Sequence, residues 1–289
     1  MRAGSTFAIG ALLLASWGFA NGQQNNVGVT PHLPSGNATE PVMPKPPVDS
    51  KALDAEPEFE VATVKPSNPD DCCARTWGRN GRHFQTNNTN LRWLLLWAYG
   101  LNAKQVVGGP AWMDEQRFDV SGELDSTQIP TERQWRIALQ KLLIDRFQIQ
   151  LHHEKQEMAA YVVTVAKGGP KLTPSTGDHR EKSTGFSGGV GQTMHGGGAD
   201  VTVADFFAEI ARLATDKPIV DQTGLTGIYD MQIAFTREDP NSLGVTQLPD
   251  TAAPNLFDAV QQQLGLKLVG EKAPVDVIVV DHAEPPGAN

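Results

Sequence analysis

The sequence predicts an α+β protein of two similar units, each with two helices packed on a small mixed or antiparallel sheet that ends in a β-hairpin. The main observation is that one order of elements occurs twice: helix, short strand, glycine turn, strand, loop, helix and hairpin. The second observation is the hairpins themselves, because they require antiparallel pairing and exclude a purely parallel α/β fold. With 289 residues, 39% of them hydrophobic, the chain can bury one large core or two small ones.

The first unit is expected over residues 58–172. It begins with a strand at FEVATVKP, where apolar and polar residues alternate. A helix capped by Thr89 or Asn90 follows, and it ends at Gly100, a position where helices favour positive φ. The apolar face of this helix consists of Leu91, Leu94, Leu95 and Ala98. A capping box at Thr131–Gln134 starts the second helix, and a hairpin with HHEKQE as its turn closes the unit.

A glycine-rich loop over 173–198 is expected to join the first unit to the second, which covers 199–286 and is followed by a tail over 287–289. Thr202 and Asn255 are placed to cap the two helices of the second unit. Its last hairpin is predicted over 266–280. Both predicted hairpin turns contain Glu-Lys, at 154–155 and at 271–272, which supports an internal duplication.

The N-terminus has the features of a secretory signal peptide over residues 1–20. Arg2 supplies the positive charge, an apolar run follows, and small residues precede a predicted cleavage site after Ala20. The apolar run is shorter than the roughly 20 residues that span a bilayer, although an uncleaved membrane anchor is the alternative. Residues 21–57, rich in Pro, Asn and Gly, are expected to be a disordered tether. We therefore expect an exported protein, periplasmic or extracellular, whose mature chain does not span a membrane.

Charge and cysteine content narrow the possible partners. A net charge of -9 argues against nucleic acid, which requires clustered Lys and Arg side chains. Cys72 and Cys73 are adjacent, a spacing that excludes a CxxC zinc or redox pair. They are expected to be two thiols in a loop, a vicinal disulfide, or a bridge to another chain.

Four aromatic residues form the candidate interaction surface: Trp93, Trp97, Tyr99 and Trp112. Leucines already fill one face of the first helix, so Trp93 and Trp97 lie together on another face. Either both faces are covered by the sheet or by the other unit, or the aromatic residues form an exposed patch for a ligand or a partner.

Candidate catalytic and metal-binding groups are present but lack the expected context. Gly185-Phe186-Ser187-Gly188-Gly189 matches G-x-S-x-G, and Asp221 and His282 would complete the order of a triad, but no strand and helix signals flank Ser187. His152, His153, His179 and His195 could contribute to a metal site, yet neighbouring strand residues such as His152 and His153 point to opposite faces. Asp221 is better explained as a turn-forming residue. No cofactor and no metal are expected.

Several segments resemble one known family. FEVATVKPS, LRWLLLWAYG, VVGGPAWMDEQRFDV, PIVDQTGLTGIYD and LGLKLVGEKAPVDVIVVDHAEPP are similar to the soil-associated TIGR03435 family, the DUF3738 domain of acidobacteria, over residues 58–286. That resemblance implies no known activity. Its members include regions joined to membrane regulatory metallopeptidases, which implies a sensing or binding part. More distantly, each unit is similar to the βαββα units at the N-termini of secretins and TonB-dependent receptors, which dock to other proteins.

Together these observations predict an exported, non-enzymatic protein with a binding, sensing or assembly role. It would act through an exposed sheet edge or through the aromatic face, on an envelope protein or a small ligand. The alternative is an extracytoplasmic hydrolase that uses Ser187 or the histidines.

Overall fold

The computed structural model describes residues 56–68, 76–126, 128–177, 182–189, 191–237 and 253–287. The predicted signal peptide, Cys72, Cys73 and His179 lie outside the described residues, as does the predicted tether except for its last two residues. Within the described part of the chain, no helix is both long and apolar enough to cross a membrane. The elements themselves are mixed α and β, which confirms the predicted fold class.

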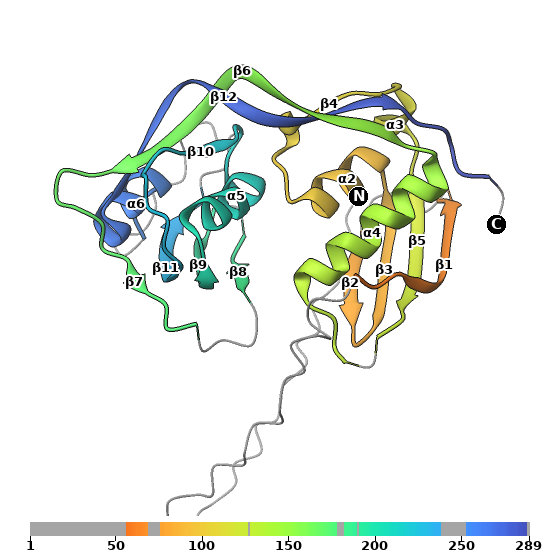
Figure 1. Ribbon diagram of the computed structural model, residues 1–289, viewed down its shortest axis with the longest axis horizontal. Coiled ribbons are helices and arrows are strands. Elements are labelled where there is room, and N and C mark those ends of the chain that lie inside the picture. Colours follow the sequence, from red (N-terminus) through yellow and green to blue (C-terminus); the bar gives the residue numbers. More distant parts are fainter. Residues whose placement is uncertain are drawn as a thin grey trace, which may run out of the picture. The chain divides into compact units, whose positions relative to one another are not determined.

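The first half of the chain, residues 56–165, contains a four-stranded antiparallel sheet in the order β1-β5-β3-β2. Helix α4 lies across this sheet, and α2 packs beside α4 (Figure 1). A 3-10 turn, a short strand and a one-turn helix connect α2 to β5. The elements are β1 (Phe59–Pro66), β2 (Thr76–Asn80), β3 (His83–Thr89), α2 (Leu91–Tyr99), η1 (Ala103–Gln105), β4 (Val106–Gly108), α3 (Trp112–Glu115), β5 (Phe118–Leu124) and α4 (Glu132–Phe147).

The second half, residues 173–282, contains another antiparallel sheet in the order β7-β11-β9-β8, with α5 and α6 packed against it. The stretch 173–198, predicted to be a loop, instead supplies two strands and most of a third. The glycines of this stretch suggested a loop, but at least one of them is required by packing within the sheet. The Phe186 ring covers Gly196, where an added Cβ would lie 2.0 Å from the ring. The elements are β7 (Thr173–Pro174), β8 (Ser183–Ser187), β9 (Thr193–Val201), α5 (Val203–Ala214), β10 (Ile219–Asp221), β11 (Tyr229–Thr236) and α6 (Leu256–Leu264).

Two long strands, β6 (Gln150–Val165) and β12 (Leu266–His282), pair with each other in antiparallel fashion along almost their whole length (Figure 1). The predicted hairpins were therefore wrong, because neither HHEKQE nor the Glu271-Lys272 segment is a turn. Both polar segments lie in the middle of the strand pair, where each chain is extended against a partner far away in sequence. The polar residues of these segments are mostly exposed on the strands, and in the sequence such a polar run cannot be distinguished from a turn.

The two long strands also exchange partners between the halves. Strand β4 of the first half pairs in parallel with β12, whereas β10 of the second half pairs in parallel with β6. Ile219 faces Tyr161 and Val106 faces Ile278, so these pairs occupy corresponding positions in the two halves. The repeat in element order is thus real, but each half is completed by a strand of the other. The division into separate units over residues 58–172 and 199–286 stays a prediction.

Local sequence signals account for the helix ends. The side chain of Asn90 accepts a hydrogen bond from the backbone N–H of Trp93, and Gly100 ends α2 with a φ of 67°. Thr131 and Gln134 form the predicted capping box at the start of α4. Thr202 and Asn255 cap α5 and α6 as expected. These caps satisfy backbone groups that a helix leaves without partners at its ends.

Asn102 joins the two halves through a buried hydrogen-bond network. Its side chain is 3% exposed and donates to the carbonyl oxygens of Ala211 (2.6 Å) and Thr215 (3.2 Å), at the C-terminal end of α5. Its Oδ1 accepts from the backbone N–H of Lys104. The amide therefore holds η1 against the end of a helix in the other half.

We predict that Asn102→Ala lowers the free energy of unfolding by about 1–3 kcal/mol, because it removes two hydrogen bonds, to the carbonyl oxygens of Ala211 and Thr215. Urea denaturation monitored by circular dichroism measures the change. Asn87→Ala is the matched control, since the side chain of Asn87 accepts an exposed hydrogen bond from Gln85, and its loss should change stability by about 0.5 kcal/mol or less. Equal effects of the two substitutions would contradict the role of Asn102.

His152 and Asp281 form a cross-strand ion pair on the long strands, with His152 Nδ1 2.8 Å from an Asp281 oxygen. The hydrogen bond to Asp281 is the main reason why the pKa of His152 is raised, and Glu154 adds a smaller effect. The folded state therefore holds this proton more tightly than the unfolded chain does. The resulting stabilisation is present below the ordinary histidine pKa and is lost as pH rises through the raised value.

We predict that Asp281→Asn returns the pKa of His152 toward its ordinary value, as an NMR titration of the imidazole signals would measure. Glu154→Gln should shift the same pKa in the same direction but by less, because its interaction with His152 is weaker. A larger shift in Glu154→Gln than in Asp281→Asn would show that the pairing is wrong.

Candidate functional site

The structure places Trp97 in the first core rather than on a surface. Its side chain is 3% exposed, and its ring stacks on Phe84 with 5.7 Å between ring centres. The guanidinium of Arg79 lies 5.6 Å from the centre of the Trp97 ring. Trp97 therefore cannot supply the exposed aromatic face that its sequence position suggested, because the sheet of the first half covers that side of α2.

The other three residues of the aromatic set are partly buried and pack against the same core. Trp112 stacks on Phe147 with ring centres 6.2 Å apart and meets Phe118 edge to face. Burial raises the pKa of the Tyr99 hydroxyl above its ordinary value. Folding thus explains most of what made Trp93, Tyr99 and Trp112 conspicuous in the sequence.

Of the residues considered for hydrolysis, Ser187 lies in a different sheet from Asp221 and His282. Ser187 ends β8 and faces His195 of β9, so a strand and not a helix follows it. Asp221 belongs to β10, where its carboxylate accepts hydrogen bonds from the backbone N–H (2.8 Å) and hydroxyl (2.7 Å) of Thr223. His282 lies at the end of β12 beside Glu284. Asp221 is thus a turn-forming residue, as predicted, and the described residues contain no hydrogen bond from Ser187 to Asp221 or His282.

The histidines are likewise dispersed. His152 pairs with Asp281, whereas the ring of its neighbour His153 lies 6.5 Å from the ring of Tyr99. His195 is exposed on β9. Across the part of the chain that the structure describes, no group of three or more potential ligands is arranged to hold a metal ion.

A cleft between α4 and β8 is the feature that best fits a binding role. Among the described residues, strand β8 is the edge of its sheet and pairs with β9 alone. A cavity of about 630 Å³ lies beside it, and the opposite wall is formed by the first turns of α4 and the end of α2. We call this the α4–β8 cleft; its lining includes Tyr99, Arg133, Arg136, Lys182, Thr184 and Glu209.

A second hollow of about 330 Å³ adjoins the α4–β8 cleft and shares Glu132, Lys182 and Thr184 with it. Its lining includes Arg79 and Gly81, at and just after the end of β2, and Ile129, which is 69% exposed. Strand β2 is the edge strand of the first sheet. The edge strands of the two sheets therefore both contribute to one continuous hollow.

A chain of alternating charges runs along the floor of the cleft. Glu132 pairs with both Arg79 and Arg136, and Arg136 reaches Glu209 of α5 at 3.4 Å. Glu209 also pairs with Arg212 on its own helix. The Arg136–Glu209 pair joins the halves, and Glu209 is the less exposed partner at 12%.

Lys182 and Asp205 form a separate pair at 2.9 Å on the β8 side of the cleft. Burial alone would raise the pKa of Asp205, but hydrogen bonds from Thr202 and Lys182 hold it below the ordinary value. Asp205 is therefore a carboxylate at neutral pH. Most charges in the cleft are thus already paired, which leaves the backbone edge as its most available recognition element.

The comparisons with known proteins can now be added to this geometry. A family model described as "Protein of unknown function (DUF3738)" matches residues 92–283. The chain belongs to the DUF3738 family. The matched range runs from α2 into the last residues of the long strand β12, so the exchanged strands and the α4–β8 cleft are part of the DUF3738 region. Comparison with curated proteins and with solved structures gave no match.

The sequence did not reveal the cleft, because it depends on which strand lies at a sheet edge. Ser183-Thr184-Gly185-Phe186-Ser187 has a weak alternation, with the aromatic ring at one partly buried position. That single aromatic ring, between a polar stretch and a glycine-rich stretch, was the one feature of the sequence that indicated a strand here. Edge position and the facing helix follow only from tertiary pairing.

We predict that Trp97→Ala lowers the free energy of unfolding by about 3–5 kcal/mol, as expected for loss of a buried aromatic side chain. Trp93→Ala should be milder, since Trp93 is only partly buried. Urea denaturation of both DUF3738 variants measures the difference. If Trp97→Ala kept wild-type stability, Trp97 would not be a core residue.

Proposed function

We propose that this DUF3738 protein is an exported binding protein that captures an extended segment of a partner protein at the free edge of β8. The observation that carries the proposal is that one edge of β8, which no other described strand pairs with, borders a cleft beside α4. An added strand can there form backbone hydrogen bonds with β8 while its side chains contact α4. Export rests on the N-terminal sequence, with its positive residue, apolar run and small residues before Ala20.

Strand length and sequence favour β8 over the edge strands β1 and β7. Strand β1 is also an edge strand, but it carries Lys65 and ends at Pro66, two devices that discourage edge pairing. Strand β7 has two residues only and offers little to pair with. Strand β8 has five residues, without proline and without a charged side chain.

Side chains around the cleft favour a partner segment that combines apolar and charged residues. Ile129 is 69% exposed and provides an apolar contact at one end. Arg133 is a well-exposed cation on α4, whose nearest carboxylate belongs to Glu56 at 4.0 Å. An acidic residue in the segment could take the place of Glu56, because a pair at that distance and exposure contributes little.

The test begins with selection of peptides that bind the full chain from a library of random sequences. Bound peptides should slow hydrogen exchange at backbone amides within Ser183–Ser187, because an added strand accepts hydrogen bonds from the outward N–H groups of β8. Protection confined to another region would contradict the proposal.

We predict that proline at one of two neighbouring positions, Thr184→Pro or Gly185→Pro, abolishes peptide binding while leaving the fold intact. In an antiparallel edge strand, successive N–H groups alternate between the paired neighbour and the open side. One substitution therefore breaks the β8–β9 ladder, and the other removes only an outward donor and adds a ring at the edge. Circular dichroism and urea denaturation identify the variant that keeps the β8–β9 ladder, because it retains wild-type stability.

The variant that keeps wild-type stability should bind selected peptides at least about tenfold more weakly. Thr184→Ala and Gly185→Ala are the matched controls and should bind normally, since a Cβ at Gly185 meets nothing within 4 Å. If the stable proline variant bound peptides as well as the wild type does, strand addition at β8 would be excluded.

A further inference from the structure

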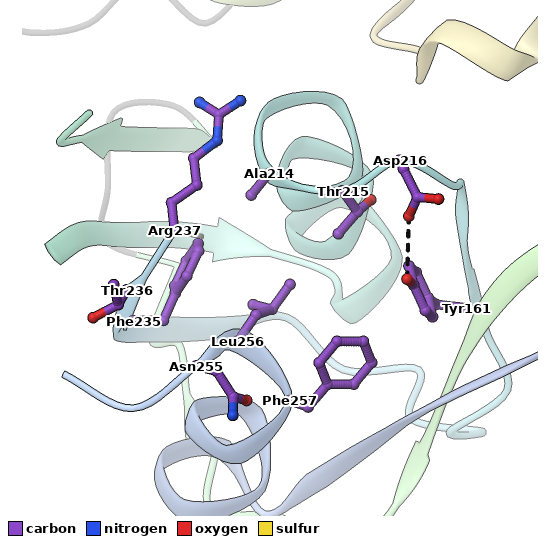
Figure 2. A pocket seen from close by; sticks show the side chains of 10 residues that line it. All are labelled: Tyr161, Ala214, Thr215, Asp216, Phe235, Thr236, Arg237, Asn255, Leu256 and Phe257. Atoms are coloured by element: carbon purple, nitrogen blue, oxygen red, sulfur yellow. Dashed lines mark hydrogen bonds between the residues drawn. The ribbon is translucent and has the colours of Figure 1, made fainter. Parts of the chain in front are cut away.

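A second cavity, of about 500 Å³, is lined by the second half of the chain together with Tyr161 and shares no lining residue with the α4–β8 cleft. It opens where the end of α5, the end of β11 and the start of α6 meet, with Tyr161 of β6 on one side (Figure 2).

Apolar side chains form the floor of this cavity. Phe235 and Leu256 are 1% and 7% exposed, so they belong to the second core and present only their surfaces to the cavity. Phe257 is 42% exposed, and its ring meets that of Tyr161 edge to face with 5.2 Å between ring centres. An exposed aromatic ring beside an apolar floor is a typical lining for a small organic ligand.

The acidic group of the cavity is already satisfied. The hydroxyl of Tyr161 donates to an oxygen of Asp216 at 3.1 Å (Figure 2), and Lys217 lies 3.8 Å from the other oxygen. The same Lys217 ammonium is 4.8 Å from the centre of the Tyr161 ring. Burial, followed by the bond to Asp216, raises the pKa of Tyr161, so the phenol keeps its proton and its role as a donor.

The basic group of the cavity is in a different situation. Arg237 stands at the rim, on the side away from Asp216 in Figure 2. Its backbone N–H donates to the carbonyl of Gln192, but among the residues that the structure describes no carboxylate pairs with its guanidinium. The lining thus combines an apolar floor, an acid paired with Lys217, and one cation for which the described residues supply no carboxylate partner.

We infer that this cavity binds a small carboxylic acid with an apolar body. The apolar part lies against Phe235, Leu256 and Phe257, and the carboxylate pairs with Arg237. A guanidinium suits this role because it can donate two parallel hydrogen bonds to a carboxylate. Because Lys217 pairs with Asp216, the charge at the cavity that the described residues leave unpaired is that of Arg237, which favours an anion over an organic cation.

The test uses 2-naphthoate as the probe and 2-naphthamide as its neutral counterpart of the same shape, with the full chain in calorimetric titrations. We predict saturable binding of one 2-naphthoate per chain, about tenfold tighter than 2-naphthamide. Octanoate serves as a second carboxylate with an aliphatic body. If neither carboxylate bound saturably at millimolar concentration, the inference would be wrong.

Substitutions separate the two parts of the site. Arg237→Gln should weaken 2-naphthoate to the level of 2-naphthamide and leave the amide unchanged, whereas Phe257→Ala should weaken both probes. Arg133→Gln, an exposed arginine in the α4–β8 cleft, is the matched control and should change neither. Equal loss in Arg133→Gln, or no loss in Arg237→Gln, would overturn the assignment. Selected peptides should still bind both cavity variants, so this site and the β8 edge can fail independently.

Discussion

The antiparallel pairing of β6 with β12 is the constraint on which the rest of the structure depends. Strand β12 enters both main cores, since Leu266 and Leu268 pack in the second and Val280 packs in the first. Strand β6 likewise contributes to both cores, since Leu151 packs against the first and Val163 lies in the second. The three-residue strands β4 and β10 pair only with these long strands. Loss of the central pairing would therefore expose apolar surface in both halves at once.

Local signals made the helices and their caps predictable. The capping box at Thr131, the caps at Asn90 and Asn255, and the stop at Gly100 all depend on residues within a few positions of one another. The repeated element order was visible for the same reason. Such features follow from backbone groups that must be satisfied at each helix end, whatever the tertiary partner.

The pairing of the long strands was not predictable in the same way. Leu266 pairs with Val165, and nothing in either segment specifies a partner so distant in sequence. A polar run inside an exposed strand then resembles a turn. The sequence left open for a related reason whether the aromatic residues are covered: helical spacing placed Trp97 on a second face of α2, but only the sheet packed on it decides that Trp97 is buried. Neither the β8 edge nor the Phe257 cavity could be located without that tertiary information.

The strand exchange has a consequence for how such a chain can assemble. A polypeptide with one half alone would leave both its long strand and its short strand without partners, and a second copy of itself would supply both. The present chain resembles a swapped homodimer whose two subunits have been covalently joined. Joining makes the association independent of concentration. The two halves also differ at corresponding places in the strand pairing, since Tyr161 borders a cavity whereas Ile278 is buried.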